Sequence, residues 1–105
     1  MTFTAWTNGD KGFGFKISAE ERDKYFSKEI HSVDILLPQN DSFINVTCNT
    51  NKASFWNKTC KELINSKIGA WLKENNYHPW PDGNPPKFEV EKINPNTYKV
   101  LRRVK

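Results

Sequence analysis

Two short polar segments contain the residues best suited to contact a nucleic acid. They span residues 7–12 and 49–54 and contain Thr7, Asn8, Asp10 and Lys11, then Asn49, Thr50, Asn51, Lys52 and Ser54. Asparagine pairs with the edge of adenine through two hydrogen bonds, lysine reaches guanine, and aspartate accepts from cytosine. The same residue types also favour turns whether or not anything binds. Composition alone therefore leaves base reading and plain turn chemistry both open.

The charge distribution suits a polyanionic partner. The chain has 105 residues and a formal net charge of +4. The basic excess lies in the second half and ends in Arg102, Arg103 and Lys105. Close to the two polar segments, Lys16, Lys58 and Lys61 are placed to bind phosphates. A solvated basic tail is the alternative interpretation.

No catalytic constellation is present in the sequence. The two histidines, His31 and His78, have no partners at zinc-ligand spacing, so we expect no metal and no cofactor. No acidic residue is followed two positions later by lysine, the spacing that many magnesium-dependent nucleases use. The His-x-Lys pattern of another nuclease class is also missing. We therefore expect no catalytic residues in this chain, and any DNA cleavage to belong to another domain.

The two cysteines and the hydropathy pattern indicate a cytoplasmic protein. Cys48 and Cys60 are too few for a disulfide scaffold, and we expect reduced, partly buried thiols. No signal peptide or membrane-spanning run is visible, so no membrane contact is expected. Cys60 at a helix start would be a candidate nucleophile, but burial is the simpler expectation.

The first half of the chain predicts four strands and one helix. Residues 2–6 and 13–17 alternate as a hairpin around the glycine-bearing turn at 8–12. Ser18 and Glu21 form a capping box for a helix over about 19–28. Strands are then predicted at 33–37, ended by Pro38, and at 43–48.

The second half predicts three strands and a longer helix. Residues 54–56 read as a brief strand, and Thr59 with Glu62 forms a second capping box. The helix behind it runs to about Asn75, with an apolar stripe of Leu63, Ile64, Ile68, Trp71 and Leu72. A proline-rich connector over 77–86 leads to a hairpin of strands 87–93 and 98–104.

These elements predict one domain over residues 1–105. The fold class is mainly β (α+β), a seven-stranded open pseudobarrel with two short helices covering its ends. Trp56 and Trp71 are expected in its core.

Several motifs resemble a known family of DNA-binding domains. They are Gly14–Ser18, Arg22–Phe26, Ser54–Trp56, Cys60–Leu63, Ile68–Leu72 and Pro79–Phe88. Together, over about residues 12–102, the sequence resembles the recognition domains of type II restriction endonucleases, which share a pseudobarrel with the plant B-three transcription-factor domains.

The resemblance implies a function. Members of the family grip the major groove with an N-arm between the first two strands and a C-arm between the fourth and fifth. Here these arms are residues 7–12 and 49–54. The resemblance thus implies sequence-specific binding of double-stranded DNA by a recognition domain of a bacterial restriction endonuclease, with catalysis in a fused or partner nuclease domain. Family arms often contain arginine, and neither arm does here, so the bases read are not assigned.

Three other functions fit parts of the sequence. The first is a reader of methylated DNA that flips a modified base into a pocket, with Trp6, Tyr25 or Trp56 as walls. The second is a protein-interaction module whose basic face serves solubility. The third is a small thiol enzyme that uses Cys60.

Overall fold

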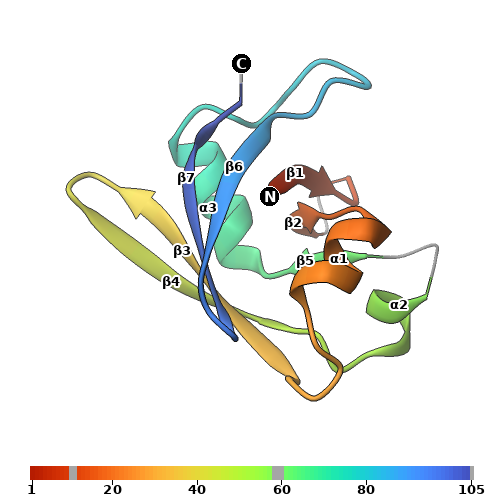
Figure 1. Cartoon of the computed structure of the whole chain (residues 1–105). Coiled ribbons are helices and arrows are strands. Elements are labelled where there is room, and N and C mark those ends of the chain that lie inside the picture. The colour runs from red at the N-terminus through yellow and green to blue at the C-terminus, as the bar shows by residue number, and fades with distance from the viewer. Residues whose placement is uncertain (10–11, 58–60, 105) are drawn as a thin grey trace.

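The computed structural model describes residues 1–9, 12–57 and 61–104. The chain forms short strands and helices in the order shown in Figure 1. The strands are β1 (Thr2–Thr7), β2 (Phe13–Lys16), β3 (Ser32–Gln39), β4 (Ser42–Asn49), β5 (Glu62–Ile64), β6 (Lys87–Asn94) and β7 (Thr97–Arg103). The helices are α1 (Ala19–Tyr25), α2 (Ala53–Trp56) and α3 (Ser66–Glu74).

The strands form one sheet that curls into a nearly closed barrel. Their order is β4-β3-β7-β6-β1-β2-β5, and only the β3–β7 pair among those described is parallel. The two edge strands, β4 and β5, approach each other without a ladder between them, which leaves an unsealed seam. The side-chain amide of Asn65 crosses this seam and donates to the carbonyl of Thr47 at 2.8 Å. The predicted mainly β, open pseudobarrel is therefore confirmed.

Aromatic rings fill the interior. Phe3, Phe15, Phe88 and Tyr98 are almost completely buried, and the ring centroid of Phe15 lies 5.8 Å from that of Phe88. Trp71, on α3, is buried beside them, as the sequence predicts, and its indole nitrogen donates to the carbonyl of Pro38 at 2.7 Å. Such rings bury large areas, which offsets the modest apolar content of the chain.

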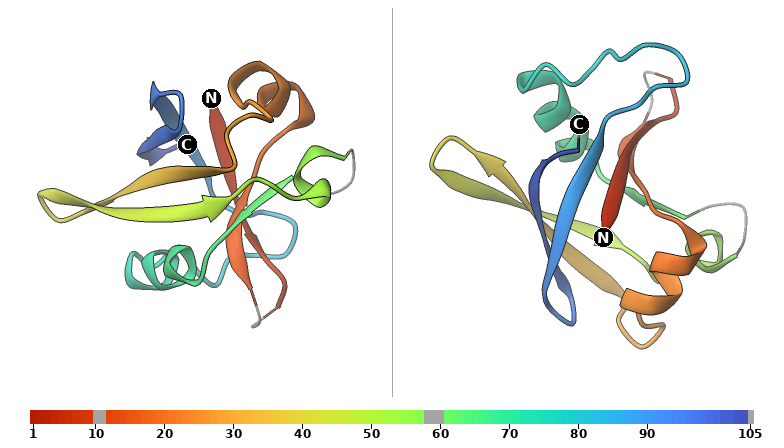
Figure 2. Two further views of the ribbon diagram at one scale, coloured as in Figure 1. Left: turned by 90° about the horizontal axis from the view of Figure 1, so that it is seen from below. Right: turned by 45° about the horizontal axis from the view of Figure 1, so that its top comes forward.

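The helices lie at opposite ends of the barrel. Figure 2 shows α1 and α2 together at one end and α3 at the other. The capping box of α1 is confirmed, because the hydroxyl of Ser18 accepts from the backbone N–H of Glu21. This helix ends at Tyr25, earlier than the predicted 28.

Two predictions around residue 60 are wrong. Residues 53–56 form the helical turn α2 instead of a strand, so the described part of the chain contains three short helices, whereas the sequence predicts two. Leu63 and Ile64 belong to the fifth strand, and α3 begins at Ser66, where the Asn65 side chain accepts from the N–H of Lys67. Pairing with the free edge of β2 outweighs the local helix signal at 62–64, since tertiary context overrides propensity. Thr59 and Cys60 lie outside the described residues.

The strand predicted to end at Pro38 continues to Gln39. The pairing of β3 with β7 covers only Asp34 to Leu36, so Pro38 lies beyond it. The carbonyl of Pro38 points to Trp71 and away from β4. The nitrogen of Pro38 points to the same side as its carbonyl. No neighbouring strand pairs with β3 on that side at this position, so the lack of an N–H on proline is tolerated.

Candidate nucleic-acid interface

The described residues of the N-arm lie at the end of the β1–β2 hairpin. The N–H of Asn8 donates to the carbonyl of Gly12 at 2.9 Å, and Gly9 has a φ of +64°, which favours glycine. The hydroxyl of Thr7 contacts the carbonyls of Gly9 and Gly12 within the loop. Thr7 therefore shapes the loop, while Asn8 is exposed and available to a partner. Asp10 and Lys11 lie outside the described residues.

The C-arm combines a buried anchor with exposed polar side chains. Thr50 is 1% exposed, and its hydroxyl donates to the carbonyl of Ile30 at 3.0 Å. Asn49 and Asn51 are exposed, and Lys52 and Ser54 are partly exposed. Thr50 thus fixes the C-arm to the chain before β3, and its four predicted neighbours remain accessible.

Arg22 supports the residues that directly follow the C-arm. The sequence does not single it out as a site residue. Its guanidinium is buried and donates to the carbonyls of Phe55 at 3.2 Å and Asn57 at 2.8 Å. It also pairs with Asp23 at 3.0 Å. The sequence predicts the helix that contains Arg22. It does not predict the contact of Arg22 with Phe55, because the two residues are 33 positions apart.

The two arms lie at opposite ends of β2. The N-arm leads directly into Phe13, the first residue of this strand. After its other end the chain enters α1, whose Arg22 bonds to the carbonyls of Phe55 and Asn57, just beyond the C-arm. The outward face of β1, β2 and β6 therefore stretches between the arms.

This outward face contains a hollow bordered by three lysines. We call it the lysine hollow; its volume is about 420 Å³, and it is lined by Thr2, Thr4, Lys16, Ile17, Ser18, Glu21, Lys61 and Lys87. Thr4 lies opposite Lys16 on β2 and opposite Lys87 on β6. The structure thus brings the predicted phosphate ligands Lys16 and Lys61 together and adds Lys87. Lys58, the third predicted ligand, lies outside the described residues.

The sequence missed Lys87 because its position depends on strand order. Alternation with the buried Phe88 indicates that Lys87 faces outward. Only the β1–β6 pairing, which joins residues more than 80 positions apart, places it beside Thr4.

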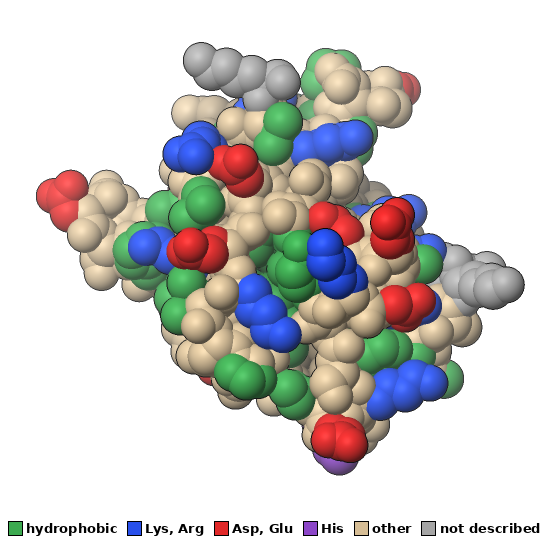
Figure 3. Space-filling model, in the orientation of Figure 1, with side chains coloured by type: hydrophobic (Ala, Val, Ile, Leu, Met, Phe, Trp, Pro, Cys, Tyr) green, Lys and Arg blue, Asp and Glu red, His purple; other side chains and the backbone are tan. Residues whose placement is uncertain are grey.

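Acidic groups near the lysine hollow are engaged or buried. Both carboxylate oxygens of Glu21 accept from the N–H of Thr2, at 3.3 and 3.1 Å. Glu62 is 6% exposed. The surface over β6, β7 and α1 has mixed charge: Figure 3 shows lysine and arginine side chains interspersed with acidic ones there.

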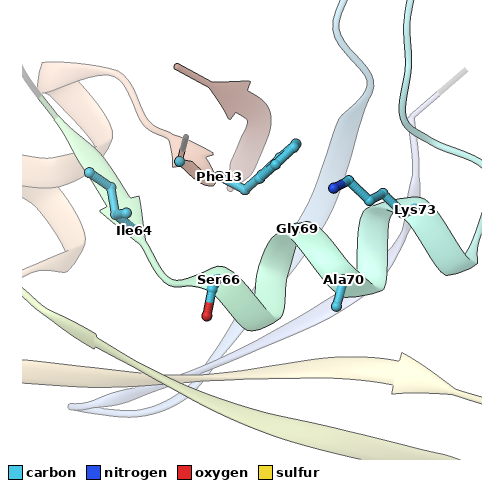
Figure 4. Close-up of a pocket in the computed structure, with 7 residues that line it drawn as sticks. Phe13, Ile64, Ser66, Gly69, Ala70 and Lys73 are labelled. Carbon is cyan, nitrogen blue, oxygen red and sulfur yellow. The ribbon is translucent and has the colours of Figure 1, made fainter. Parts of the chain in front are cut away.

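A second hollow lies beside the N-arm and is mainly apolar. Figure 4 shows it between Phe13 and helix α3, and its lining consists of Gly12, Phe13, Ile64, Ser66, Gly69, Ala70 and Lys73. A Cβ atom on Gly69 would lie 2.6 Å from the ring of Phe13, so glycine permits this close packing. The ammonium of Lys73 lies 4.8 Å from the centroid of the same ring. These contacts of the Phe13 ring with Gly69 and Lys73 fix the base of the N-arm against α3.

The described residues offer little for catalysis. Cys48 is a buried free thiol, and burial raises its pKa to about 12, so it is a poor nucleophile. His78 packs edge-on against Phe13 and Trp80, at 5.0 and 5.3 Å between ring centroids. Among residues 1–9, 12–57 and 61–104 no cluster of potential metal ligands occurs. Cys60, the other candidate nucleophile, lies outside these ranges.

The three aromatic residues considered for a base-binding cage belong to separate elements. Trp6 lies on β1 beside Gly12, Tyr25 ends α1, and Trp56 ends α2. Trp56, which the sequence places in the core, packs against the core but stays partly exposed.

None of the helices in the described part of the chain is both long and apolar enough to cross a membrane. Comparison with protein-family models, with curated proteins and with solved structures finds no match for this chain.

Proposed function

We propose that this protein binds double-stranded DNA in a sequence-specific manner, with the N-arm and the C-arm reading bases and the lysine hollow binding the backbone. In this proposal the chain is the recognition module of a restriction endonuclease, and cleavage belongs to a separate catalytic domain. The motifs that resemble B-three-like recognition domains support that role, as does the lack of nuclease spacing in the sequence.

The observation that carries the proposal is the arrangement of lysines around Thr4. Lys16 and Lys87 flank Thr4 on neighbouring strands, and Lys61 borders the same hollow. Neither Lys16 nor Lys87 forms an ion pair within the described residues. Three ammonium groups around one hollow favour an anionic partner, although Glu62 lies directly opposite Lys16 and Glu21 also lines the hollow. A DNA phosphate backbone supplies such an anion, and the arms at both ends would position it.

The first test is a salt titration with charge-reversed variants. Wild-type affinity for a duplex, measured by fluorescence anisotropy, should fall steeply as salt rises. Replacing Lys16→Glu and Lys87→Glu together should weaken binding by at least about tenfold and make the salt dependence shallower. Lys99→Glu is the control, because Lys99 lies on β7, away from the arms, over the ring of Phe43. Equal binding by the double variant and the wild type would favour a protein-interaction module instead.

The second test addresses specificity. Selection from a randomised duplex library at two salt concentrations should enrich one short sequence, because specific complexes keep their base contacts as phosphate contacts weaken. A pool that stays random after several rounds would contradict sequence-specific recognition. Repeating the selection with methylated duplexes separates this function from a methylated-DNA reader.

A further inference from the structure

A small hollow next to the C-arm has the composition of a nucleobase site. It has a volume of about 270 Å³ and is lined by Lys28, Asn51, Lys52, Ala53 and Trp56. Pockets for drug-sized ligands are usually about 300–1,000 Å³, so this one suits a smaller planar group. We call it the Trp56 pocket.

The indole of Trp56 is held in a fixed orientation. Its ring nitrogen donates to the carbonyl of Thr50 at 2.9 Å, and Thr50 is itself anchored to Ile30. The ring centroid of Phe55 lies 5.2 Å from that of Trp56 at an interplanar angle of 87°. A fixed aromatic surface loses little conformational entropy when a ligand stacks on it.

Two cations lie over the indole and differ in accessibility. The guanidinium carbon of Arg22 and the ammonium of Lys28 each lie 5.6 Å from the ring centroid. Arg22 is buried and bonded to backbone carbonyls, whereas Lys28 is exposed. A ligand that stacks on Trp56 would therefore displace the ammonium of Lys28 and leave Arg22 in place.

The rest of the lining supplies polar recognition. The backbone N–H of Asn51 is engaged by Asn49 and His31, but its side-chain amide has no hydrogen bond within the described residues. An amide offers both donors and an acceptor to the edge of a base. Lys28 and Lys52 also line the pocket, and their ammonium groups suit phosphate oxygens.

From these contacts we infer that the Trp56 pocket binds one unstacked nucleobase of the bound DNA. The base stacks on Trp56, Asn51 contacts its edge, and Lys28 with Lys52 binds the flanking phosphates. This inference rests on the proposed function and goes beyond it, because recognition through the arms does not require an unstacked base. It differs from an aromatic cage, since the lining contains one aromatic residue.

Duplexes with one bulged nucleotide test this inference. A bulged base is already unstacked, so the protein should bind such a duplex about tenfold or more tighter than the matched duplex. Trp56→Ala should abolish that preference, and Trp56→Phe should retain most of it because phenylalanine still stacks. Circular dichroism and thermal melts verify that each variant is folded. Trp80→Ala is the matched control, because Trp80 is also half-buried but lies beside His78 in the connector.

A second readout covers the case in which Trp56→Ala does not fold. A 2-aminopurine placed at the bulge should lose emission when it stacks on the wild-type indole, and Asn51→Ala should weaken this response. The inference is overturned if both duplexes bind equally and the 2-aminopurine signal stays unchanged on binding. If neither duplex binds, the proposed function fails first.

Discussion

At the scale of single residues, burial decides which groups stay chemically inert. The thiol of Cys48 is completely buried on the inner side of β4, and burial raises its pKa from 9.0 to about 12. Burial also raises the pKa of the Tyr98 hydroxyl, from 10.0 to about 12. In the folded protein both groups therefore stay neutral well above the pH at which they ionise in the unfolded chain.

The raised pKa of Cys48 predicts a loss of stability at alkaline pH. Between pH 9 and 10 the unfolded chain loses the thiol proton and the folded protein keeps it, so the free energy of unfolding decreases as pH rises. The limiting slope is about 1.4 kcal/mol per pH unit. Urea unfolding under reducing conditions at several pH values measures it, and Cys48→Ala should flatten the curve in this window. An unchanged slope in the variant would contradict the prediction.

At the scale of elements, the C-arm depends on helix α1, which is far from it in the sequence. Arg22 on α1 bonds to the carbonyls of Phe55 and Asn57, which surround the end of α2. Nη1 of Arg22 donates to both carbonyls, while Nε and Nη2 pair with Asp23. The single ammonium of lysine cannot reproduce these contacts from three nitrogens. The C-arm and the Trp56 pocket therefore share one support.

Replacing Arg22 with lysine tests this support. Arg22→Lys should lower the free energy of unfolding by about 1–3 kcal/mol, because one ammonium replaces a guanidinium that serves the buried carbonyl of Phe55, the partly buried carbonyl of Asn57 and the carboxylate of Asp23. DNA affinity should fall as well, although this side chain is buried. Arg102→Lys is the matched control, since Arg102 is 72% exposed and its ion pair with Glu89 should contribute at most about 1 kcal/mol. Denaturant titrations and anisotropy on both variants provide the comparison, and equal effects would exclude a special role for Arg22.

Sequence patterns predicted most elements, and the failures have a physical cause. Alternation over long strands and the Ser18 capping box are local signals, and both agree with the structure. The segment at residues 54–56 is too short for its period to separate strand from helix. Residues 62–64 form a strand because β2 offers a free edge, which only the assembled sheet reveals. For the same reason Lys87, Arg22 and Lys28 could not be assigned to a site from the sequence.

At the scale of the whole molecule, the dimensions limit how much DNA the protein covers. The principal extents are 34 × 30 × 24 Å. Stacked base pairs advance about 3.4 Å each, so the longest axis matches about ten base pairs. In the proposed complex, one molecule would therefore contact about that length of duplex and not much more.

This size predicts a plateau in affinity with duplex length. Duplexes that contain the selected sequence should bind more tightly as they are extended to about ten base pairs, and little more beyond that, apart from statistical effects. Anisotropy with a length series measures the plateau. Affinity that continued to rise steeply beyond about 20 base pairs would indicate that several copies bind together.

The separation of the two arms also has a consequence for the sequence that such a protein would recognise. The N-arm joins β1 to β2, whereas the C-arm leads from β4 into α2, which Arg22 of α1 holds in place. A protein with two base-contacting loops held on one rigid sheet would recognise an interrupted sequence. The bases at both ends of the site would be specified, and the positions between them would accept any base. Lengthening β2 by one residue would then shift the spacing of those ends and reverse the side of the sheet on which Lys16 lies.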